Sequence, residues 1–515
     1  MALFRSIATV GGWTMVSRVL GFVRDVLIAN VLGASMIADA FFVAFKFPNF
    51  FRRLFAEGAF NAAFVPLFAG RLTTQGRAEA IRFAGEVAAV LGTILLVFTL
   101  AAILAMPWLM VVIAPGFIDD PAKFMLTTEL TRITFPYLMF MALVALMGGM
   151  LNSIERFAAT AAAPIVLNIV LIAVLAAVRA GVLPSPGPAL AWGVAAAGLG
   201  QLVWIALACK RAGILFTLPR PRLTPGVRRL LTLMFPALIG AGVVQINLVI
   251  DVILASTLAE GSVSYLYYAD RVNQLPLGVV GVAVGIALLP LLVRQLRAGE
   301  YQAAQNSQNR AIEFALTLTL PAAAALIVIP EQIVTVLFQR GAFDPAAARA
   351  TAAALAAFAA GLPAYVLIKA LIPGFHARED TKTPVKIAIV AVIANVALAL
   401  ILMQFLAHAG IALATALTAW FNAAMLGWIL IRRGHLVFDR RLVRRVPRLA
   451  LAAMAMAGAL WGGAAMLAGP LNDGEPSRIA ALAALIAGAM AVFALIAMAT
   501  GAVRLGELRA ALKRG

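Results

Sequence analysis

The chain has 515 residues, of which 63% are hydrophobic and only 12% are charged. Soluble globular proteins are about half apolar and about one quarter charged, so this composition excludes an ordinary soluble domain and indicates an integral membrane protein. The net charge of +19 does not indicate nucleic-acid binding, because most basic residues flank apolar segments, as they do in membrane proteins.

The apolar runs are about 20 residues or longer, which predicts an all-α membrane protein rather than a barrel. The N-terminal segment is interpreted as the first membrane helix, since Arg18 and Arg24 interrupt what would be the apolar core of a cleaved signal peptide. The fourteen predicted helices span 8–32, 36–68, 84–113, 124–151, 161–178, 189–209, 230–257, 263–293, 311–330, 347–372, 384–403, 409–431, 449–468 and 478–501.

The distribution of lysine and arginine tests this map. If the N-terminus is cytoplasmic, 28 of the 41 basic residues fall on the cytoplasmic side and four on the outer side. The outer loops lean acidic instead, as in "IDDP" at 118–121. This asymmetry predicts a multi-pass protein with both termini in the cytoplasm.

The sequence offers little enzymatic or metal chemistry. Cys209 is the single cysteine, so no internal disulfide or cysteine-based metal site is expected. There is no Walker A loop, which argues against an ATPase. Scattered residues of two further kinds are expected in loops or at solvated helix ends: the histidines His376, His408 and His435, and the acids Glu86, Glu129 and Glu313.

An internal repeat relates the two halves of the chain. "RDVLIANVLGA" (24–34) resembles "IDVILASTLAE" (250–260), "AFKFPNF" (44–50) resembles "VNQLPLG" (272–278), and "TFPYLMF" (134–140) resembles "GLPAYVL" (361–367). The offsets are 226 to 228 residues, which predicts two six-helix repeats of the same orientation around a central cavity. The expected divisions are an N-lobe at 1–210, a C-lobe at 211–433 and two extra helices within 434–515.

Several charged residues lie inside the predicted spans, where an arginine costs about 2.5–3.5 kcal/mol on insertion scales. The cations are Arg18, Arg24, Lys46, Arg52, Arg53 and Arg271, and the nearby acids are Asp25, Asp39, Glu57 and Asp270. The surplus of positive charge is typical of a cavity that binds a multiply charged anion such as a diphosphate. The alternative is a set of internal salt bridges that hold the bundle together.

Helix geometry leaves some of these roles open. Asp39, Lys46 and Arg53 are spaced by seven, but Pro48 is expected to kink the helix between them. Geometry therefore does not decide whether Arg52 or Arg53 faces a cavity, although Arg53 and Glu57 form an obvious i,i+4 pair.

Asp251 is a separate case, because it occupies the repeat position of Asp25 without an arginine beside it. It is a candidate ligand for a coupling cation, with Asn395 as a conceivable partner. The alternative is a hydrogen-bonded or protonated acid.

Five segments carry a resemblance to a known family: "MVSRVLGFVRD" (15–25), "ADAFFVAFKFPNFFRRLFAEGAFNAAFVPLFA" (38–69), "APGFIDD" (114–120), "YYADRVNQLPLGVVGVAVG" (267–285) and "PGFHAREDTKTPVKIAIV" (373–390). Together they resemble the MurJ (MviN) lipid II flippase family of the MOP exporter superfamily. The resemblance implies transport of the undecaprenyl-diphosphate-linked peptidoglycan precursor from the cytoplasmic to the periplasmic leaflet of the bacterial inner membrane. It covers essentially the whole chain.

The resemblance also implies roles for particular residues. Arg18, Arg24, Arg52 and Arg271 match arginines of the central cavity that are thought to engage the diphosphate, and Lys46 is grouped with them as a substrate-binding candidate. Asp25, Asp39, Glu57 and Asp270 are the expected gate or cavity acids, with Arg24 and Asp39 as gate partners. The last two helices are expected to form a groove for the lipid tail, and Asp251 is the candidate sodium-site residue.

The resulting hypothesis is an alternating-access lipid transporter, not an enzyme, that needs no cofactor beyond a coupling cation, sodium or proton. Its expected partners are lipid II and membrane lipids, with no nucleic acid; a monomer is expected, associated with cell-wall synthesis proteins. Two alternatives stay open. One is a cation-coupled multidrug exporter of the same superfamily, and the other is a membrane scaffold that recruits cell-wall enzymes.

Overall fold

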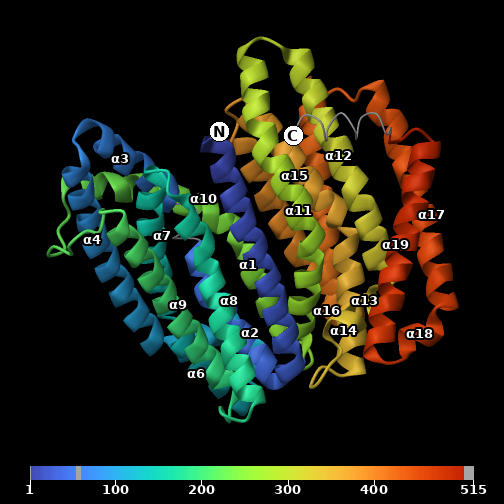
Figure 1. The fold of residues 1–515 in the computed structure, drawn as a ribbon, viewed down its shortest axis with the longest axis horizontal. Helices are drawn as coiled ribbons and strands as arrows, with labels where there is room; N and C mark the ends of the chain where they lie inside the picture. Colours follow the sequence, from blue (N-terminus) through green and yellow to red (C-terminus); the bar gives the residue numbers. More distant parts are fainter. Residues whose placement is uncertain (1, 54–59, 504–515) are drawn as a thin grey trace. The chain divides into compact units, whose positions relative to one another are not determined.

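The computed structural model describes residues 2–53 and 60–503, and this part of the chain is built from helices without strands (Figure 1). The first half contains α1 (Ala2–Leu32), α2 (Met36–Arg52), α3 (Phe60–Thr74), α4 (Arg77–Leu104), α5 (Met106–Ile113), the 3-10 helix η2 (Pro115–Phe117), α6 (Pro121–Thr134), α7 (Tyr137–Ser153), α8 (Phe157–Arg179) and α9 (Pro186–Arg211). The second half contains α10 (Pro225–Ser256), α11 (Ser262–Arg297), α12 (Tyr301–Val328), α13 (Pro330–Phe338), α14 (Pro345–Ala360), α15 (Leu362–His376), α16 (Lys382–Arg432), α17 (Arg440–Met466), α18 (Ala468–Asn472) and α19 (Glu475–Ala499).

The predicted all-α architecture is confirmed, with differences at the helix boundaries. Several segments predicted as single helices are interrupted, for example 84–113 between α4 and α5 at Ala105 and 347–372 between α14 and α15 at Gly361. The two helices expected at 384–403 and 409–431 meet directly within α16, at a sharp kink where Ala407 has φ 47° and ψ −130°. Hydropathy alone does not reveal such breaks, because the chain stays apolar through them.

The helix breaks repeat between the halves. The break at Ala105 corresponds to the one at Ile329, and each is followed by a short helix, α5 or α13, with a proline in its first turn. The break between α6 and α7 at Phe135 and Pro136 corresponds to the one between α14 and α15 at Gly361. These offsets of 224 to 226 residues agree with the internal repeat read from the sequence.

Contacts divide the chain into two units, which differ from the lobes expected from the repeat. Unit 1 comprises Met1–Ser264 together with Arg340–Phe343. Within it α1 packs against α8, α8 against α9, and α2 against α6, as can be followed among the blue to green helices of Figure 1. Aromatic side chains fill the interior beside α2, where Phe47 and Phe51 pack against Phe135.

Unit 2 comprises Tyr265–Gln339 and Asp344–Gly515. Within it α16 packs against α14 and α15, and α12 packs against α15. The C-terminal helix α19 packs against α17, which in turn packs against α12 (Figure 1). The last helices are therefore attached to the rest of the unit mainly through α17.

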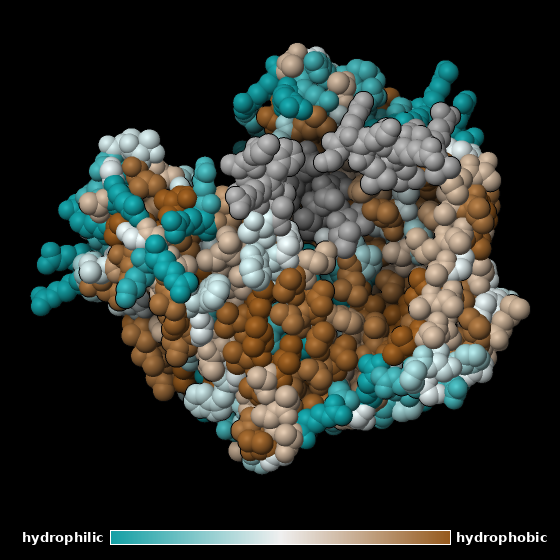
Figure 2. Space-filling model, viewed as in Figure 1, coloured by the Kyte–Doolittle hydropathy of each residue, from teal (hydrophilic) through white to brown (hydrophobic). Residues whose placement is uncertain are grey.

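The surface has the character of a membrane protein. Nine helical segments of the described ranges are long and apolar enough to cross a membrane. Large apolar side chains are exposed on these segments and on the short helix α5. Trp108 on α5 and Trp461 and Met466 on α17 each expose more than 70% of their surface. Figure 2 shows apolar residues over much of the visible surface, with polar residues gathered mainly toward helix ends. The chain is thus a multi-pass membrane protein whose lateral surface suits lipid.

Candidate functional site

Arg24 and Asp25, adjacent on α1, form a buried ion pair. The Nε and Nη2 atoms of Arg24 donate to one carboxylate oxygen of Asp25 at 3.0 and 2.7 Å. Nη1 of Arg24 donates to the side-chain oxygen of Asn168 on α8 at 2.9 Å. The amide of Asn168 in turn donates to the carbonyl of Ser17, 2.9 Å away. Asn168 therefore fixes the guanidinium of Arg24 and ties α8 to α1, a role that the sequence does not indicate.

Asp39, in the first turn of α2, is 1% exposed and is bound by four donors. Lys123 Nζ donates to it at 2.8 Å, and the backbone N–H of Gly261 donates at 2.8 Å. Ser264 donates from its backbone N–H at 3.0 Å and from its hydroxyl at 2.6 Å. Asp39 thus accepts the N–H of Ser264 in the first turn of α11 and the N–H of Gly261 just before that helix. In this structure Lys123 is the cation that pairs with Asp39, and the expected role of Arg24 and Asp39 as gate partners stays a prediction.

Lys123 has a buried side chain, although the charge distribution places it on the outer side among the solvated basic residues. The reason lies in the local fold: Asp120 caps α6 by accepting from the N–H of Lys123 at 3.1 Å, and Pro121 starts the helix. The capped turn directs the lysine inward, where its Nζ lies 4.2 Å from the centre of the Phe117 ring. A cation-π contact and an ion pair together hold the buried charge.

The charged segment that follows Pro48 on α2 is described only in part. Lys46 and Arg52 are half-buried, and Arg52 Nε donates to the side-chain oxygen of Asn49 at 2.9 Å. Arg53 is exposed. Glu57 lies outside the described residues, so its pairing with Arg53 remains a prediction, as does the assignment of Arg52 to the substrate.

Arg18 lies on α1 one and a half turns before Arg24 and is exposed. Its neighbours on the helix, Met15 and Val19, are also exposed. The Arg18 side chain is therefore surrounded by apolar residues of α1. In such surroundings a guanidinium group is stabilised by an anionic partner or by water.

The remaining candidates on α11 belong to unit 2. Arg271 is half-buried, donates from Nη2 to the hydroxyl of Tyr267 at 3.0 Å and lies 4.8 Å from the centre of that ring. Asp270 is half-buried and accepts from the side chain of Gln274. Tyr267 thus orients Arg271 on the same helix face, one turn away.

The candidate cation site is not assembled within either unit. Asp251 is half-buried on α10 of unit 1, whereas Asn395 belongs to unit 2 and accepts a hydrogen bond from Thr418 at 3.4 Å. Across the described ranges, three or more His, Cys, Asp or Glu residues nowhere gather in a way that could hold a metal ion. A site formed by backbone and amide oxygens around Asp251 therefore stays a prediction.

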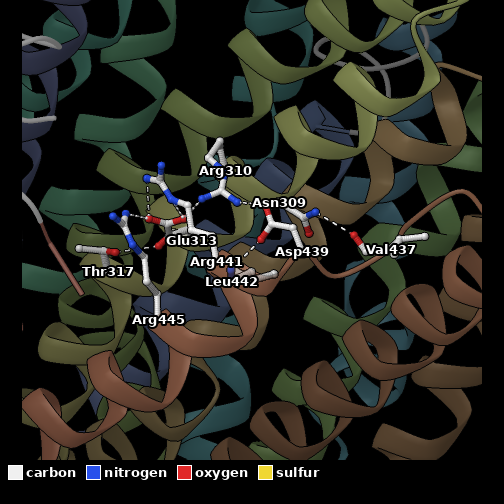
Figure 3. A network of polar contacts seen from close by, with 9 residues as sticks. All are labelled: Asn309, Arg310, Glu313, Thr317, Val437, Asp439, Arg441, Leu442 and Arg445. Carbon is white, nitrogen blue, oxygen red and sulfur yellow. Dashed lines mark hydrogen bonds and ion pairs between the residues drawn. The ribbon is translucent and has the colours of Figure 1, made fainter. Parts of the chain in front are cut away.

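A second charge cluster joins α12 to α17 (Figure 3), and the expectation that Glu313 lies at a solvated helix end is wrong. Glu313 is 7% exposed and accepts a bidentate pair of hydrogen bonds from Arg441 at 3.0 and 3.1 Å. Arg310 and Arg445 also donate to its carboxylate, and Arg310 bridges onward to Asp439. In the sequence, only the four-residue spacing of Arg441 and Arg445 points to this cluster, because it places both side chains on one helix face.

The fold of this chain is similar to that of a solved membrane transporter. A solved multidrug-resistance MATE family transporter of the MOP superfamily, in an inward-facing conformation, matches with a TM-score of 0.67 over 81% of this chain and 94% of its own at 13% identity. At that identity the match shows the fold alone. The chain therefore shares the helical fold of such a membrane transporter.

A family model and proteins of higher sequence identity identify the family. The model of the lipid II flippase MurJ family matches residues 28–473. A probable lipid II flippase MurJ from Rhizobium meliloti (strain 1021) is 51% identical over all of this chain and 97% of its own length. A solved lipid II flippase MurJ in an inward closed conformation matches with a TM-score of 0.78 and 25% identity over 95% of this chain and 97% of its own. The chain belongs to the lipid II flippase MurJ family.

Proposed function

We propose that this protein moves lipid II, the lipid-linked peptidoglycan precursor, from the cytoplasmic to the periplasmic leaflet of the bacterial inner membrane. The observation that carries the proposal is membership of the MurJ family over essentially the whole chain, at 51% identity to a full-length relative. The substrate leaves the protein chemically unchanged, so the protein acts as a transporter and not as an enzyme.

Buried and half-buried cations supply the chemistry for the head group. Guanidinium groups match phosphate oxygens in a planar, bidentate geometry, so Arg24, Arg52 and Arg271 suit a diphosphate. Asp39 is engaged by Lys123 and by the start of α11, so it does not neutralise these arginines. Asn168 and Tyr267 hold two of the guanidinium groups in place before the substrate arrives.

The lipid tail would remain in the membrane beside α17 and α19. The stretch from Ala450 to Met466 carries no charged residue, and Trp461 and Met466 are largely exposed. The distribution of basic residues favours cytoplasmic termini, and the absence of a nucleotide-binding loop favours membrane potential or a sodium or proton gradient as the driving force. A monomer that cooperates with cell-wall synthesis proteins fits this scheme.

Depletion and complementation test the proposal in cells. Arg18→Ala, Arg24→Ala, Arg52→Ala and Arg271→Ala are each expected to lose complementation while the protein is still present at normal levels. Arg179→Ala is the matched control, because Arg179 is exposed near a helix end. Full complementation by all four variants would contradict a role for these arginines in transport.

The two alternatives make opposite predictions. A multidrug exporter that takes cationic drugs should have an acidic cavity, and the cations of this chain do not favour that function. Drug efflux without any effect on cell-wall precursors would favour it. A scaffold would tolerate neutralisation of the arginines, so the same four variants distinguish it from a transporter.

A further inference from the structure

Two opposite charges lie on the exposed face of α6 in unit 1. Met125, Glu129 and Arg132 are all exposed, and their spacing of four and three residues places them on one face of the helix. The short helix α5 packs against α6 and follows the end of α4. Leu104 on α4 and Trp108 on α5 expose 74% and 73% of their surface. The two charges are therefore set in a surface that otherwise suits lipid.

A proline in α5 explains how the arginine is held. The residue four places after Ile103 is Pro107, which has no N–H to donate, so the carbonyl of Ile103 lacks its usual helical donor. Arg132 Nε donates to this carbonyl at 3.1 Å. Within the described ranges, neither the Nη groups of Arg132 nor the carboxylate of Glu129 has a hydrogen bond or an ion pair. The guanidinium is thus fixed at one nitrogen and keeps its other donors for a ligand.

The second repeat has no charge at the equivalent place. α14 is the counterpart of α6, and offsets of 224 to 227 residues place 353–359, "AALAAFA", opposite Glu129 and Arg132. Leu355 and Phe358 in this stretch are buried. The fold therefore does not require charges at this position, which indicates that the pair on α6 serves to bind something.

The depth of the pair in the membrane follows from helix length. α6 and α7 form one span of 33 residues, which is about 50 Å long and exceeds the hydrocarbon core of about 30 Å. When the span is centred, about 10 Å at each end lies among the headgroups. Glu129 and Arg132 lie about 12 and 16 Å along α6, so their backbones lie about 2 and 6 Å inside the core.

Both side chains can reach the headgroup region from this depth. Side chains on a helix point toward its N-terminus, and the N-terminus of α6 is its outer end in the orientation that the basic residues favour. Long charged side chains extend in this way to keep their polar ends out of the hydrocarbon. Glu129 and Arg132 are therefore placed to meet the headgroup of an outer-leaflet lipid, with Glu129 the nearer to the outer surface.

We propose that Glu129 and Arg132 bind the headgroup of an outer-leaflet phospholipid that carries both a phosphate and an amine, as phosphatidylethanolamine does. The Nη groups of Arg132 donate to the phosphate, and Glu129 accepts from the ammonium group. Residues three apart on a helix face are about 5–6 Å apart, a separation that the short ethanolamine link can span.

The order of the groups along the membrane normal fits this lipid. Its phosphate lies deeper than its amine, as Arg132 lies deeper than Glu129. Its acyl chains continue inward along α4, where Val97, Leu100 and Leu104 are exposed on one face. This site does not use the arginines proposed to bind lipid II.

Native mass spectrometry tests the site on the purified full-length protein. The protein is titrated with phosphatidylethanolamine or with phosphatidylglycerol of the same acyl chains, and the bound lipid is counted. Phosphatidylethanolamine should bind about tenfold more tightly, because only its headgroup offers Glu129 an ammonium group. Equal affinity for the two lipids would overturn the recognition of the amine.

Two variants separate the roles of the two side chains. Arg132→Gln should weaken the binding of phosphatidylethanolamine about tenfold or more, because it removes the charged donor to the phosphate. Glu129→Gln should remove the preference for phosphatidylethanolamine over phosphatidylglycerol. Arg179→Gln is the matched control, because Arg179 is also exposed near the outer end of a helix but has no acid one turn before it. The control should bind both lipids as the wild type does.

The remaining outcomes separate lipid binding from misfolding and from protein binding. Glu129 contacts no polar partner in the described ranges, so Glu129→Gln should unfold at the same temperature as the wild type and tests the site even if Arg132→Gln is less stable. Unchanged affinity for phosphatidylethanolamine in both variants would overturn the proposal. A membrane protein that copurifies with the wild type and is lost in both variants, while lipid binding is unchanged, would assign the surface to a protein helix instead. Lipid II translocation does not enter these titrations, so a failure of the proposed function would leave the lipid site standing.

Discussion

Lys123 and Asp39 form a buried ion pair at 2.8 Å across 84 residues of sequence. The carboxylate also accepts two backbone N–H groups and a hydroxyl from the start of α11 and the residue before it. One acid on α2 therefore holds α6 and the start of α11 together. Such an arrangement depends on each member, because a buried charge left without its partner is strongly destabilising.

Lys123→Met is expected to destabilise the protein by about 3 kcal/mol, near the lower end for a broken buried pair, because the donors from the start of α11 still satisfy Asp39. The double variant Asp39→Asn with Lys123→Met should lose less than the sum of the two single variants, since it leaves no unpaired charge. Thermal unfolding in detergent measures this, with the exposed Lys386→Met as control. Additive losses would show that the pair is not coupled.

Arg52 and Arg53 are expected to differ in function although they are adjacent. Arg52 is half-buried and held by Asn49, whereas Arg53 is exposed. Arg52→Ala should therefore abolish complementation, and Arg53→Ala should retain most of it. Arg52→Lys should be impaired as well, because an ammonium group does not reproduce bidentate binding of phosphate. The reverse order of severity would reassign the substrate contact to Arg53.

Glu313→Gln is expected to loosen α17 from α12, because Arg310, Arg441 and Arg445 then surround an uncharged amide (Figure 3). A loss of about 3–5 kcal/mol is typical when one partner of a buried ionic cluster is removed. Hydrogen exchange should increase selectively in α17 and α19. Glu331→Gln, at an exposed position in the first turn of α13, should leave exchange unchanged. Unaltered exchange in α17 for Glu313→Gln would contradict the anchoring role.

Asp380, in the loop before α16, provides a prediction about pH. Hydrogen bonds from Thr383 and the charge of Arg433 hold the pKa of its carboxyl well below its usual range. A depressed folded-state pKa contributes stability above the unfolded pKa of about 3.9, and this stability is lost as pH falls through the folded value. The stability difference between wild type and Asp380→Ala should therefore be constant from about pH 5 to pH 8 and shrink below about pH 4. A change near neutral pH would point to another group.

Hydropathy, charge asymmetry and the repeat predict most of the architecture, because the membrane imposes helix length and orientation directly on the sequence. They do not predict the kink at Ala407, since its neighbours are as apolar as the rest of the helix. The burial of Lys123 is not predicted by sequence analysis. The count of basic residues on each side of the membrane treats every lysine near the end of a span as exposed to water. Only the cap at Asp120, read together with the acid at Asp39, indicates that the side chain turns inward.

Some contacts of the candidate site can be predicted from the sequence and others cannot, for a similar reason. The Arg24–Asp25 pair can be expected from two adjacent charges within a span, but Asn168 contacts Arg24 from 144 residues away. Likewise, the arginines of α17 contribute to the orientation signal, although two of them bind Glu313. Single residues reveal where charge is buried, whereas their partners depend on tertiary packing.

Reconstituted translocation of lipid II tests the central claim most directly. Purified protein in liposomes, with and without a membrane potential or a sodium gradient, should move lipid II to the opposite leaflet, and Arg179→Ala should do so equally well. Arg24→Ala should reduce the rate by about tenfold or more, because a charge-assisted contact to the diphosphate contributes about 1.5–3 kcal/mol. Lipid II that stays in its original leaflet under every driving force, or that moves as fast with Arg24→Ala, would contradict the account.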